Sequence, residues 1–243
     1  MRISHVKSPD IIITNYCILR TYTREKPNSR ISTTIPISFT WLAKMGFVPG
    51  ALVCAVPYPD GFTLTLQNNE NTGYGKTLRV KLGQRLTLSV NIARDFPIPE
   101  LSGGDFLAAA YEYGTITARK LPPADKYYVV DTQNHSAYLR LNGGWLVDAG
   151  FPPNTIAIVA PTHNGITFTA WNGKHDEYPE LVKHARKHKC QIIQIRECQA
   201  ITFMELFADV LDKVGLKNGD IAGICCEHGK MTLFKPVLTT TEA

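Results

Sequence analysis

The chain has 243 residues, of which 44% are hydrophobic and 19% charged, and its net charge is +5. This composition excludes a disordered chain, because it supplies enough apolar surface for one large or two ordinary domains. No stretch of the sequence approaches the ~20 apolar residues that span a bilayer. The first 17 residues hold too short an apolar patch for a secretory signal. We therefore expect a cytoplasmic protein with no membrane partner.

The charge is divided unequally between the two halves. Residues 1–122 carry 14 Lys and Arg against 8 Asp and Glu, a net of +6, whereas residues 123–243 carry 12 against 13, a net of −1. A basic half favours an anionic partner, although an ordinary solvated surface explains an excess of this size equally well.

In chain order, the first half alternates strand candidates with turn signals. Apolar runs predict strands within 10–22 and 76–90, and "ALVCAVPYPDGFTLTL" (51–66) predicts a hairpin. A short helix candidate that ends at Gly46 precedes this hairpin.

The second half repeats this order of elements. Strands are predicted within 126–131 and 190–195. The segments 155–171 and 221–234 each predict a hairpin, the first of them around an Asn164-Gly165 turn, which is a strong hairpin signal.

Two helices are predicted in the second half. Asn142 is the expected N-cap of helical turns over 145–149, with Gly150 as a left-handed stop. The segment "FMELFADVLDKV" (203–214) predicts a longer helix that ends at Gly215, and its expected capping box is formed by Thr202 and Glu205.

The sequence contains two internal repeats. At an offset of 104, residues 32–66 align without gaps to 136–170, and the identical pairs include Trp41/Trp145 and Gly46/Gly150. Chance predicts only about two identities in such a window. At an offset of 115, residues 101–120 align to 216–235. The order of units is therefore A–B–A′–B′.

These repeats predict a mainly β fold with short helices (α+β). One unit of some 35–50 residues cannot bury both faces of its hairpin, but two interlocked units can. We expect A and B to form one barrel-like domain (1–122), and A′ and B′ a second (123–243). The linker is expected near "KLPPADK" (120–126), where prolines and charges cluster.

The segment "SAYLRLNGGWLVDAGFPPNTIAIV" (136–159) resembles the pattern P-x-L-R-L-x-G-x-W-L-x-x-A-G-F-x-P-G-x-x-V, which typifies the SymE-like toxin family. That family belongs to the AbrB/MazE-type swapped-hairpin superfamily. Residues 32–56 match the pattern more loosely, and Asn154 departs from it by replacing a glycine. The upstream segment 17–30 also resembles the family's first strand and the basic segment that follows it.

This resemblance implies a particular architecture and two functions. In the superfamily two chains exchange hairpins to form one barrel, so this chain would join covalently what its relatives build from two subunits. Family members are described as RNA-cleaving toxins, whereas AbrB-type proteins are DNA-binding regulators. The resemblance thus implies either an endoribonuclease of a toxin–antitoxin system or a nucleic-acid-binding protein.

The residues give no recognisable catalytic constellation. A metal-free ribonuclease needs a general acid and a general base, yet no histidine recurs between the halves, since His163 corresponds to Pro59 and His228 to Tyr113. Glu112 and Glu227 do recur beside turn glycines, a position where solvated acidic residues are common. The catalytic residues therefore stay unknown, although His163 or His228 would serve if only one half were active.

The six cysteines predict neither a disulfide framework nor a metal site. They include no CxxC, and most lie in apolar runs, which indicates free, buried thiols. In "CCEHG" (225–229) adjacent cysteines on a strand point to opposite faces, so packing in the core explains them better than zinc. We expect no metal and no cofactor.

Three basic segments favour nucleic-acid binding, because cations and an aromatic ring are what contact with a phosphate backbone uses. Each segment lies near the start of a repeat unit. They supply the candidate nucleic-acid-binding residues Arg20, Tyr22, Arg24, Lys26 and Arg30 in the first segment, Arg79, Lys81 and Arg85 in the second, and Lys183, Arg186, Lys187 and Lys189 in the third.

The sequence therefore predicts a SymE/AbrB-like protein that grips the phosphates of DNA or RNA through basic strands and loops. An endoribonuclease toxin is one alternative. A protein-interaction module, which binds a protein partner or antitoxin and in which the basic excess is incidental, is another. The chain is expected to be a monomer with internal pseudo-symmetry or a homodimer.

Overall fold

The computed structural model describes residues 16–25, 31–37, 41–67, 76–79, 81–82, 86–91, 98–163 and 165–237. This part of the chain is mainly β with few short helices, as the sequence predicts. None of its helices is long and apolar enough to cross a membrane. Lys26, Arg30 and Arg85 of the predicted basic segments lie outside the described residues.

The strands of the N-terminal half are β1 (Tyr16–Arg20), β2 (Tyr22–Glu25), β3 (Ile31–Ile37), β4 (Leu52–Tyr58), β5 (Gly61–Leu66), β6 (Lys76–Arg79), β7 (Lys81–Leu82), β8 (Leu86–Asn91), β9 (Phe106–Glu112) and β10 (Thr115–Lys120).

The C-terminal half holds β11 (Lys126–Val129), β12 (Asp131–Gln133), β13 (Ser136–Asn142), α1 (Trp145–Asp148), β14 (Ile156–Thr162), β15 (Gly165–Trp171), η1 (His175–Glu177), α2 (Tyr178–Lys187), β16 (Gln191–Gln194), β17 (Arg196–Cys198), β18 (Ile201–Phe207), α3 (Ala208–Leu211), η2 (Asp212–Val214), β19 (Ile221–Glu227) and β20 (Lys230–Phe234).

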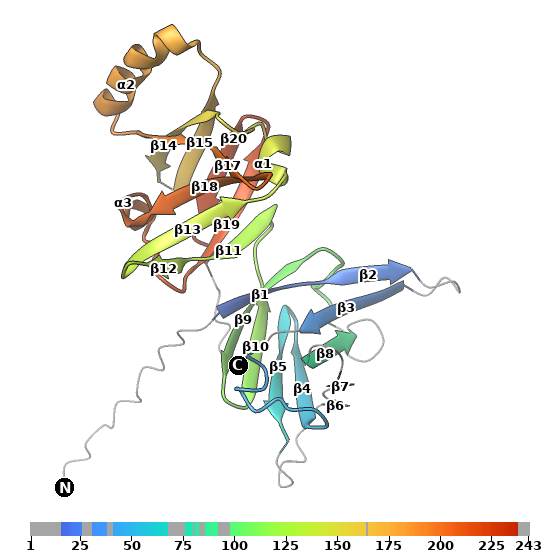
Figure 1. Ribbon diagram of the computed structural model, residues 1–243. Helices are drawn as coiled ribbons and strands as arrows, with labels where there is room; N and C mark the ends of the chain where they lie inside the picture. The colour runs from blue at the N-terminus through green and yellow to red at the C-terminus, as the bar shows by residue number, and fades with distance from the viewer. Residues whose placement is uncertain are drawn as a thin grey trace, which may run out of the picture.

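The strands pair into four antiparallel sheets, two in each half (Figure 1). The N-terminal sheets have the orders β1-β9-β10-β5-β4-β6 and β2-β3-β8-β7. The C-terminal sheets have the orders β11-β19-β20-β15-β14-β16 and β12-β13-β18-β17, which correspond to the first two strand by strand. The four predicted hairpin strand pairs β4–β5, β9–β10, β14–β15 and β19–β20 all form.

The expected closed barrel does not form among the described residues. In each half the chain divides its strands between two open sheets, so β1 and β6, or β11 and β16, remain at opposite edges of a six-stranded sheet. The apolar faces of the two sheets enclose the core between them instead, which buries the same side chains without closing the hydrogen-bond ladder.

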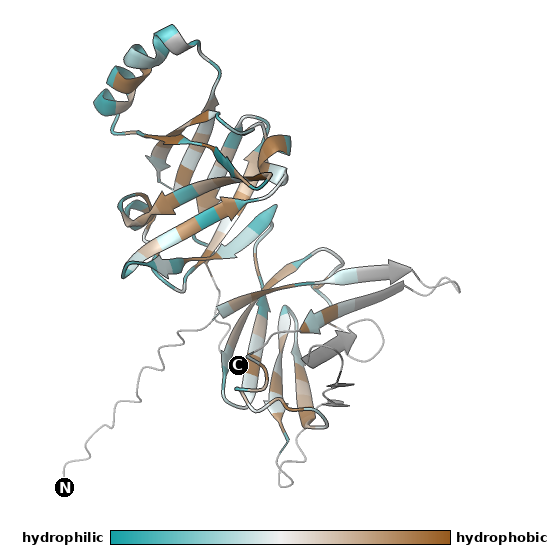
Figure 2. Ribbon diagram, viewed as in Figure 1, coloured by the Kyte–Doolittle hydropathy of each residue, from teal (hydrophilic) through white to brown (hydrophobic). Residues whose placement is uncertain are grey.

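Each half has its own hydrophobic core between its two sheets. The first draws on residues from Cys17 to Ala118, and the second on residues from Val130 to Leu233. Along β13 hydrophobic and hydrophilic residues alternate, as expected for a strand with one buried face (Figure 2). A smaller cluster joins the halves and consists of Ala108, Leu121, Tyr127 and Ile221.

Single buried residues mark the points where the chain passes from one sheet to the other. Val130 donates its N–H to the Asp220 carbonyl and accepts from the Gly219 N–H, both at 2.8 Å. Ile195 makes the corresponding pair of bonds with Thr155 and Asn154, at 2.8 and 2.9 Å. In the N-terminal half Thr21 bonds in the same way to Asp105 and Gly104, at 2.9 and 3.1 Å. These bonds satisfy backbone groups that would otherwise be buried unpaired.

The helix predicted over 145–149 forms, but without its expected cap. Gly150 ends the turns of α1 with a φ of +87°, as predicted. The N-cap is Gly144, with no side-chain cap bond, and not Asn142. The carbonyl of Asn142 instead accepts a hydrogen bond from Trp145 Nε1 at 2.8 Å.

The second predicted helix is largely wrong. Residues 201–207 form the strand β18, which pairs with β13, and only 208–214 are helical before Gly215, whose φ is +67°. The segment "ITFMELF" buries alternate residues against the core, and this tertiary pairing outweighs its local helix propensity. Thr202 and Glu205 therefore lie on a strand and form no capping box.

Gly150 and Gly215 provide a matched test of how closely the chain packs around each left-handed glycine. A Cβ at Gly150 would lie 2.6 Å from the backbone nitrogen of Gly229, whereas a Cβ at Gly215 would meet nothing within 4 Å. We expect Gly215→Ala to lower the free energy of unfolding by about 1 kcal/mol through backbone strain alone. Gly150→Ala should cost about 3 kcal/mol, because the hairpin turn must also move. Urea denaturation measures both, and equal losses would contradict the close packing of the turn.

Candidate nucleic-acid interface

The first basic segment begins at the end of β1 and continues into β2. Arg20 is exposed, and its guanidinium carbon lies 5.2 Å from the centre of the Phe106 ring. Tyr22 is 49% exposed at the start of β2. Arg24 lies on the same strand, where its backbone is opposite Ser32 of β3. In the described part of this segment, the exposed cation Arg20 and the accessible ring of Tyr22 therefore lie two residues apart in the sequence.

The second basic segment reaches the sheet β2-β3-β8-β7, to which β2 of the first segment also belongs. Arg79 is the last residue of β6, and Lys81 begins β7, opposite Thr87 of β8. In the order β2-β3-β8-β7, the strands that carry Arg24 and Lys81 form the two edges of one sheet. The fold thus brings together two segments that are more than fifty residues apart in the sequence.

The third basic segment lies elsewhere. Its residues belong to α2 and the turn after it, which connect β15 to β16 in the C-terminal half, and Figure 1 shows α2 at the far end of that half from β2. Leu181 and Ala185 bury one side of the helix. The exposed cations are Lys183, Arg186, Lys187 and Lys189.

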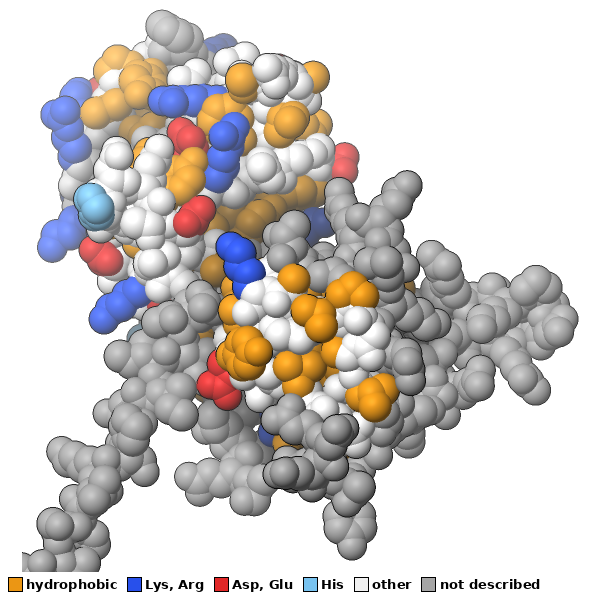
Figure 3. Space-filling model, turned by 60° about the horizontal axis from the view of Figure 1, so that its bottom comes forward, with side chains coloured by type: hydrophobic (Ala, Val, Ile, Leu, Met, Phe, Trp, Pro, Cys, Tyr) orange, Lys and Arg blue, Asp and Glu red, His pale blue; other side chains and the backbone are white. Residues whose placement is uncertain are grey.

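Local interactions explain part of the charge on α2. Lys183 forms an exposed ion pair with Glu180 at 2.5 Å, a contact of small net energy. Arg186 and Lys187 lie in the last helical turn, where cations interact favourably with the helix dipole. Over the face that Figure 3 displays, the Lys and Arg side chains of the described residues lie in separate groups among hydrophobic, acidic and uncharged ones. The third basic segment belongs to the other half of the chain from the first two.

The structure also shows a surface that the sequence reasoning missed. The outer face of the sheet β12-β13-β18-β17 carries aromatic rings and guanidinium groups. Arg140 lies 4.0 Å from the centre of the Phe203 ring, and the Tyr138 and Phe207 rings are 5.6 Å apart. Phe207 is 50% exposed. We call Tyr138, Arg140, Phe203, Phe207 and Arg196 the aromatic–arginine face.

Glu205 lies within this face and orders it. Its carboxylate accepts a hydrogen bond from the Tyr138 hydroxyl at 2.7 Å, and its other oxygen lies 3.7 Å from the Arg196 guanidinium. Burial raises the pKa of Tyr138, and the hydrogen bond with Glu205 raises it further, so the phenol stays protonated as a donor. The sequence signal for this face was the period-two spacing of residues 203, 205 and 207, which the helix prediction for 203–214 concealed.

The residues considered for catalysis lie at three hairpin turns, and only Glu227 and His228 share one of them. His163 is exposed between β14 and β15, and His228 is exposed between β19 and β20. Glu112 and Glu227 end β9 and β19, in different sheets. Within the described part of the chain, none of the four forms a hydrogen bond or ion pair with another ionisable side chain. The described residues therefore include no hydrogen-bonded general acid and base from this set.

The cysteines are free, but only Cys17 is fully buried, which corrects the expectation that most are. Cys225 is exposed, and Cys226 packs against the core from the other face of β19. Burial raises the pKa of Cys17 to about 12. Burial, with a further contribution from Asp125, raises that of Cys226 to about 11. No group of three or more His, Cys, Asp and Glu side chains suited to a metal ion occurs among the described residues.

Comparisons with known proteins add no further assignment. No protein-family model, no curated protein and no solved structure matches the chain. The resemblance of 136–159 to the SymE-like pattern therefore stays a prediction from the residues.

The raised thiol pKa values predict that the fold loses stability in alkali. Unfolded thiols ionise near pH 9, whereas Cys17 in the fold stays protonated to about pH 12. Its stabilising contribution is thus complete below pH 9 and is lost as the pH rises toward 12. Above pH 9 the free energy of unfolding of the wild type should fall as the pH rises. In Cys17→Ala we expect this fall to be smaller by about 1.4 kcal/mol per pH unit. Urea denaturation between pH 8 and 11 measures it.

The exposed Cys198 supplies the control, because its thiol gains little burial on folding. Cys198→Ala should keep the wild-type slope. Equal slopes for Cys17→Ala and the wild type would show that the buried thiol does not couple to folding.

Proposed function

We propose that the protein is a SymE/AbrB-like nucleic-acid-binding protein, related to toxins or regulators, that grips the phosphate backbone of DNA or RNA in the cytoplasm. In this proposal each half is a pseudo-dimeric swapped-hairpin domain, with the domains at 1–122 and 123–243. The observation that carries the function is the placement of two basic segments at the two edges of the sheet β2-β3-β8-β7.

The strand pairing within the C-terminal half supports this architecture. At a shift of 65 residues, β11 to β15 correspond to β16 to β20. The strand β11 pairs with β19, and its counterpart β16 pairs with β14, so each unit lends its first strand to the other unit's hairpin. The pairs β13–β18 and β15–β20 join corresponding strands, as a pseudo-twofold axis requires.

The placement of cations supports contact with phosphates. Arg20, Arg24 and Lys81 lie on or beside one sheet, with Tyr22 exposed between the first two. Cations spread over a sheet neutralise phosphates along a strand, whereas an aromatic ring offers a stacking surface for a base. The recurring Trp41 and Trp145 take no part in this, because both pack against the cores.

The test is binding of end-labelled RNA and duplex DNA, measured by mobility shift at several salt concentrations. The wild type should bind at least one of them, more weakly as salt rises, because phosphate contacts release counterions. The triple variant Arg20→Ala/Arg24→Ala/Lys81→Ala should weaken binding. It should also lower the salt slope by about 0.7–0.9 for each phosphate that the variant no longer neutralises.

A matched variant separates a local effect from one of net charge. Lys213→Ala/Lys217→Ala/Lys230→Ala removes the same charge from exposed positions of the C-terminal half and should bind like the wild type. Binding that is insensitive to salt, or equal weakening in both variants, would contradict the proposed interface. RNA fragments that vanish when His163 or His228 is replaced would instead indicate the endoribonuclease.

A further inference from the structure

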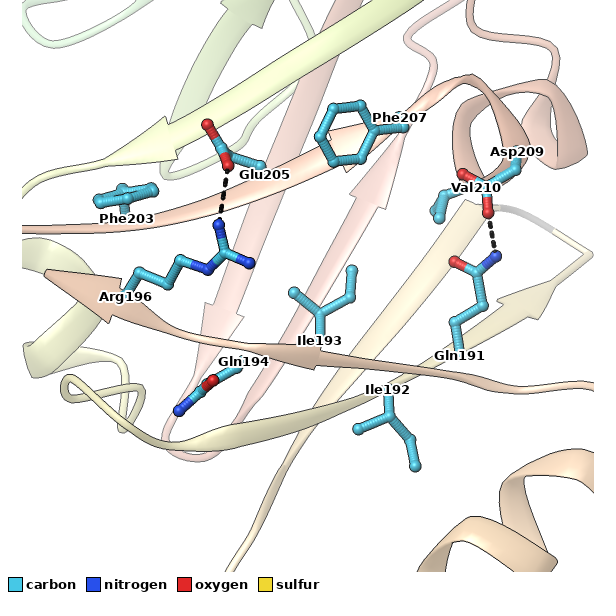
Figure 4. A pocket seen from close by; sticks show the side chains of 10 residues that line it. All are labelled: Gln191, Ile192, Ile193, Gln194, Arg196, Phe203, Glu205, Phe207, Asp209 and Val210. Atoms are coloured by element: carbon cyan, nitrogen blue, oxygen red, sulfur yellow. Dashed lines mark hydrogen bonds and ion pairs between the residues drawn. The ribbon is translucent and has the colours of Figure 1, made fainter.

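A groove lies beside the aromatic–arginine face, between β16 and β18. Its volume is about 310 Å³. Figure 4 shows Ile193 of β16 pointing toward β18, with Phe207 and Val210 on the opposite side. Ile192 points away on the other side of β16 (Figure 4). Apolar side chains therefore form the inner part of the groove.

The C-terminal half contains a second position that corresponds to this groove, and at that position side chains fill the space. Ile193 lies opposite Ala157 in the pairing of β16 with β14, and Tyr128 lies opposite Ala222 in the pairing of β11 with β19. Val210 and Trp145 each lie five residues before a left-handed glycine.

At the filled site two aromatic side chains occupy the space. The rings of Tyr128 and Trp145 are 6.4 Å apart, and Trp145 Nε1 donates a hydrogen bond to the Tyr128 hydroxyl at 3.1 Å. Ile193 and Val210 are the smaller side chains at the two corresponding positions. The groove therefore has the place and shape of a planar ring that the chain itself supplies at the other site.

The rim of the groove has hydrogen-bonding groups suited to the edge of a nucleobase. The Gln191 amide donates and accepts, Glu205 accepts, and Arg196 donates. A base edge presents donors and acceptors together, so a mixed rim of this kind matches it better than it matches a purely apolar ligand.

The charges around the groove also fit a nucleic-acid strand. The Arg196 side chain is 66% exposed, and its ion pair with Glu205 is long, so the guanidinium is held weakly and is accessible to a phosphate. The two carboxylates of the rim already accept hydrogen bonds, Glu205 from Tyr138 and Asp209 from the Gln191 amide. Arg140 adds a second exposed guanidinium on the adjoining face.

We propose that the groove receives one base of a single-stranded nucleic acid, while neighbouring bases stack on Phe207 and Tyr138 and phosphates contact Arg196 and Arg140. This inference rests on the proposed function and adds to it a substrate class and a base-dependent site. It also assigns the single-strand contact to the C-terminal half, away from the basic N-terminal sheet.

The test uses fluorescence anisotropy with three labelled probes of equal length: an oligo-dA strand, an abasic strand and a duplex. The wild type should bind oligo-dA roughly tenfold more tightly than the abasic strand, because stacking of bases adds to backbone contact. Ile193→Tyr, which places in the groove the ring that Tyr128 provides at the filled site, should lower this ratio severalfold, while the stacking on Phe207 and Tyr138 keeps it above one. Binding of the abasic strand itself should not change.

Val147→Tyr is the control, since it adds the same ring at an exposed position of α1 that does not line the groove. It should keep the tenfold ratio. Phe207→Ala changes an exposed side chain and should lower the ratio without disturbing the core, so the inference stays testable if Ile193→Tyr does not fold.

The outcomes separate this inference from the function on which it rests. A wild type that binds neither these probes nor the labelled RNA of the mobility shift would refute the proposed function. Equal binding of oligo-dA and abasic strands by the wild type, or an unchanged ratio in folded Ile193→Tyr, would refute the groove alone. Competition by AMP at the concentration at which oligo-dA competes would identify a mononucleotide site and overturn the assignment to single strands.

Discussion

The exchange of strands between sheets at Val130 and Ile195 is the constraint on which the C-terminal half depends. Each residue is buried, and its backbone N–H and C=O bond to the turn that precedes the other unit's hairpin. Because an unpaired backbone group at such a position is costly, the first strand of each unit is held against the other unit. Neither unit can bury its hairpin alone, and the cores form only when both are present.

The features that the sequence predicts well are those that local chemistry decides. The left-handed glycines Gly150 and Gly215 need a backbone conformation that few other residues adopt, so the helix stops follow from single positions. The predicted β14–β15 hairpin also forms, although Gly165, expected in its turn, begins β15 opposite Thr162. The strand β18 depends instead on its partner β13. Its residues also fit a helical pattern, and only the tertiary pairing decides between the two.

The candidate site shows the same limit. Composition identifies Arg24, Lys81 and Lys187 as parts of basic segments, but the order of strands decides that the first two share a sheet and that the third lies apart. The aromatic–arginine face draws on three strands, β13, β17 and β18, so its members are unrelated in the linear sequence. Sequence reasoning therefore finds which groups are available, and the topology determines which of them meet.

The two four-stranded sheets show how a shared topology supports different surfaces. Where the C-terminal sheet pairs Tyr138 with Phe207 and Arg140 with Glu205, the N-terminal sheet pairs Thr34 with Asn91 and Pro36 with Ser89. The backbone register is the same at these positions, but the C-terminal sheet has large aromatic and charged residues where the N-terminal sheet has small or uncharged ones. Lys81 of β7 has a basic counterpart in Arg196 of β17, whereas Arg24 of β2 has none in β12, whose sequence is "DTQ". Because each half is held together by its own core, the outer faces of the two sheets are free to differ. Contact with a nucleic-acid backbone and contact with its bases therefore need not lie on the same sheet.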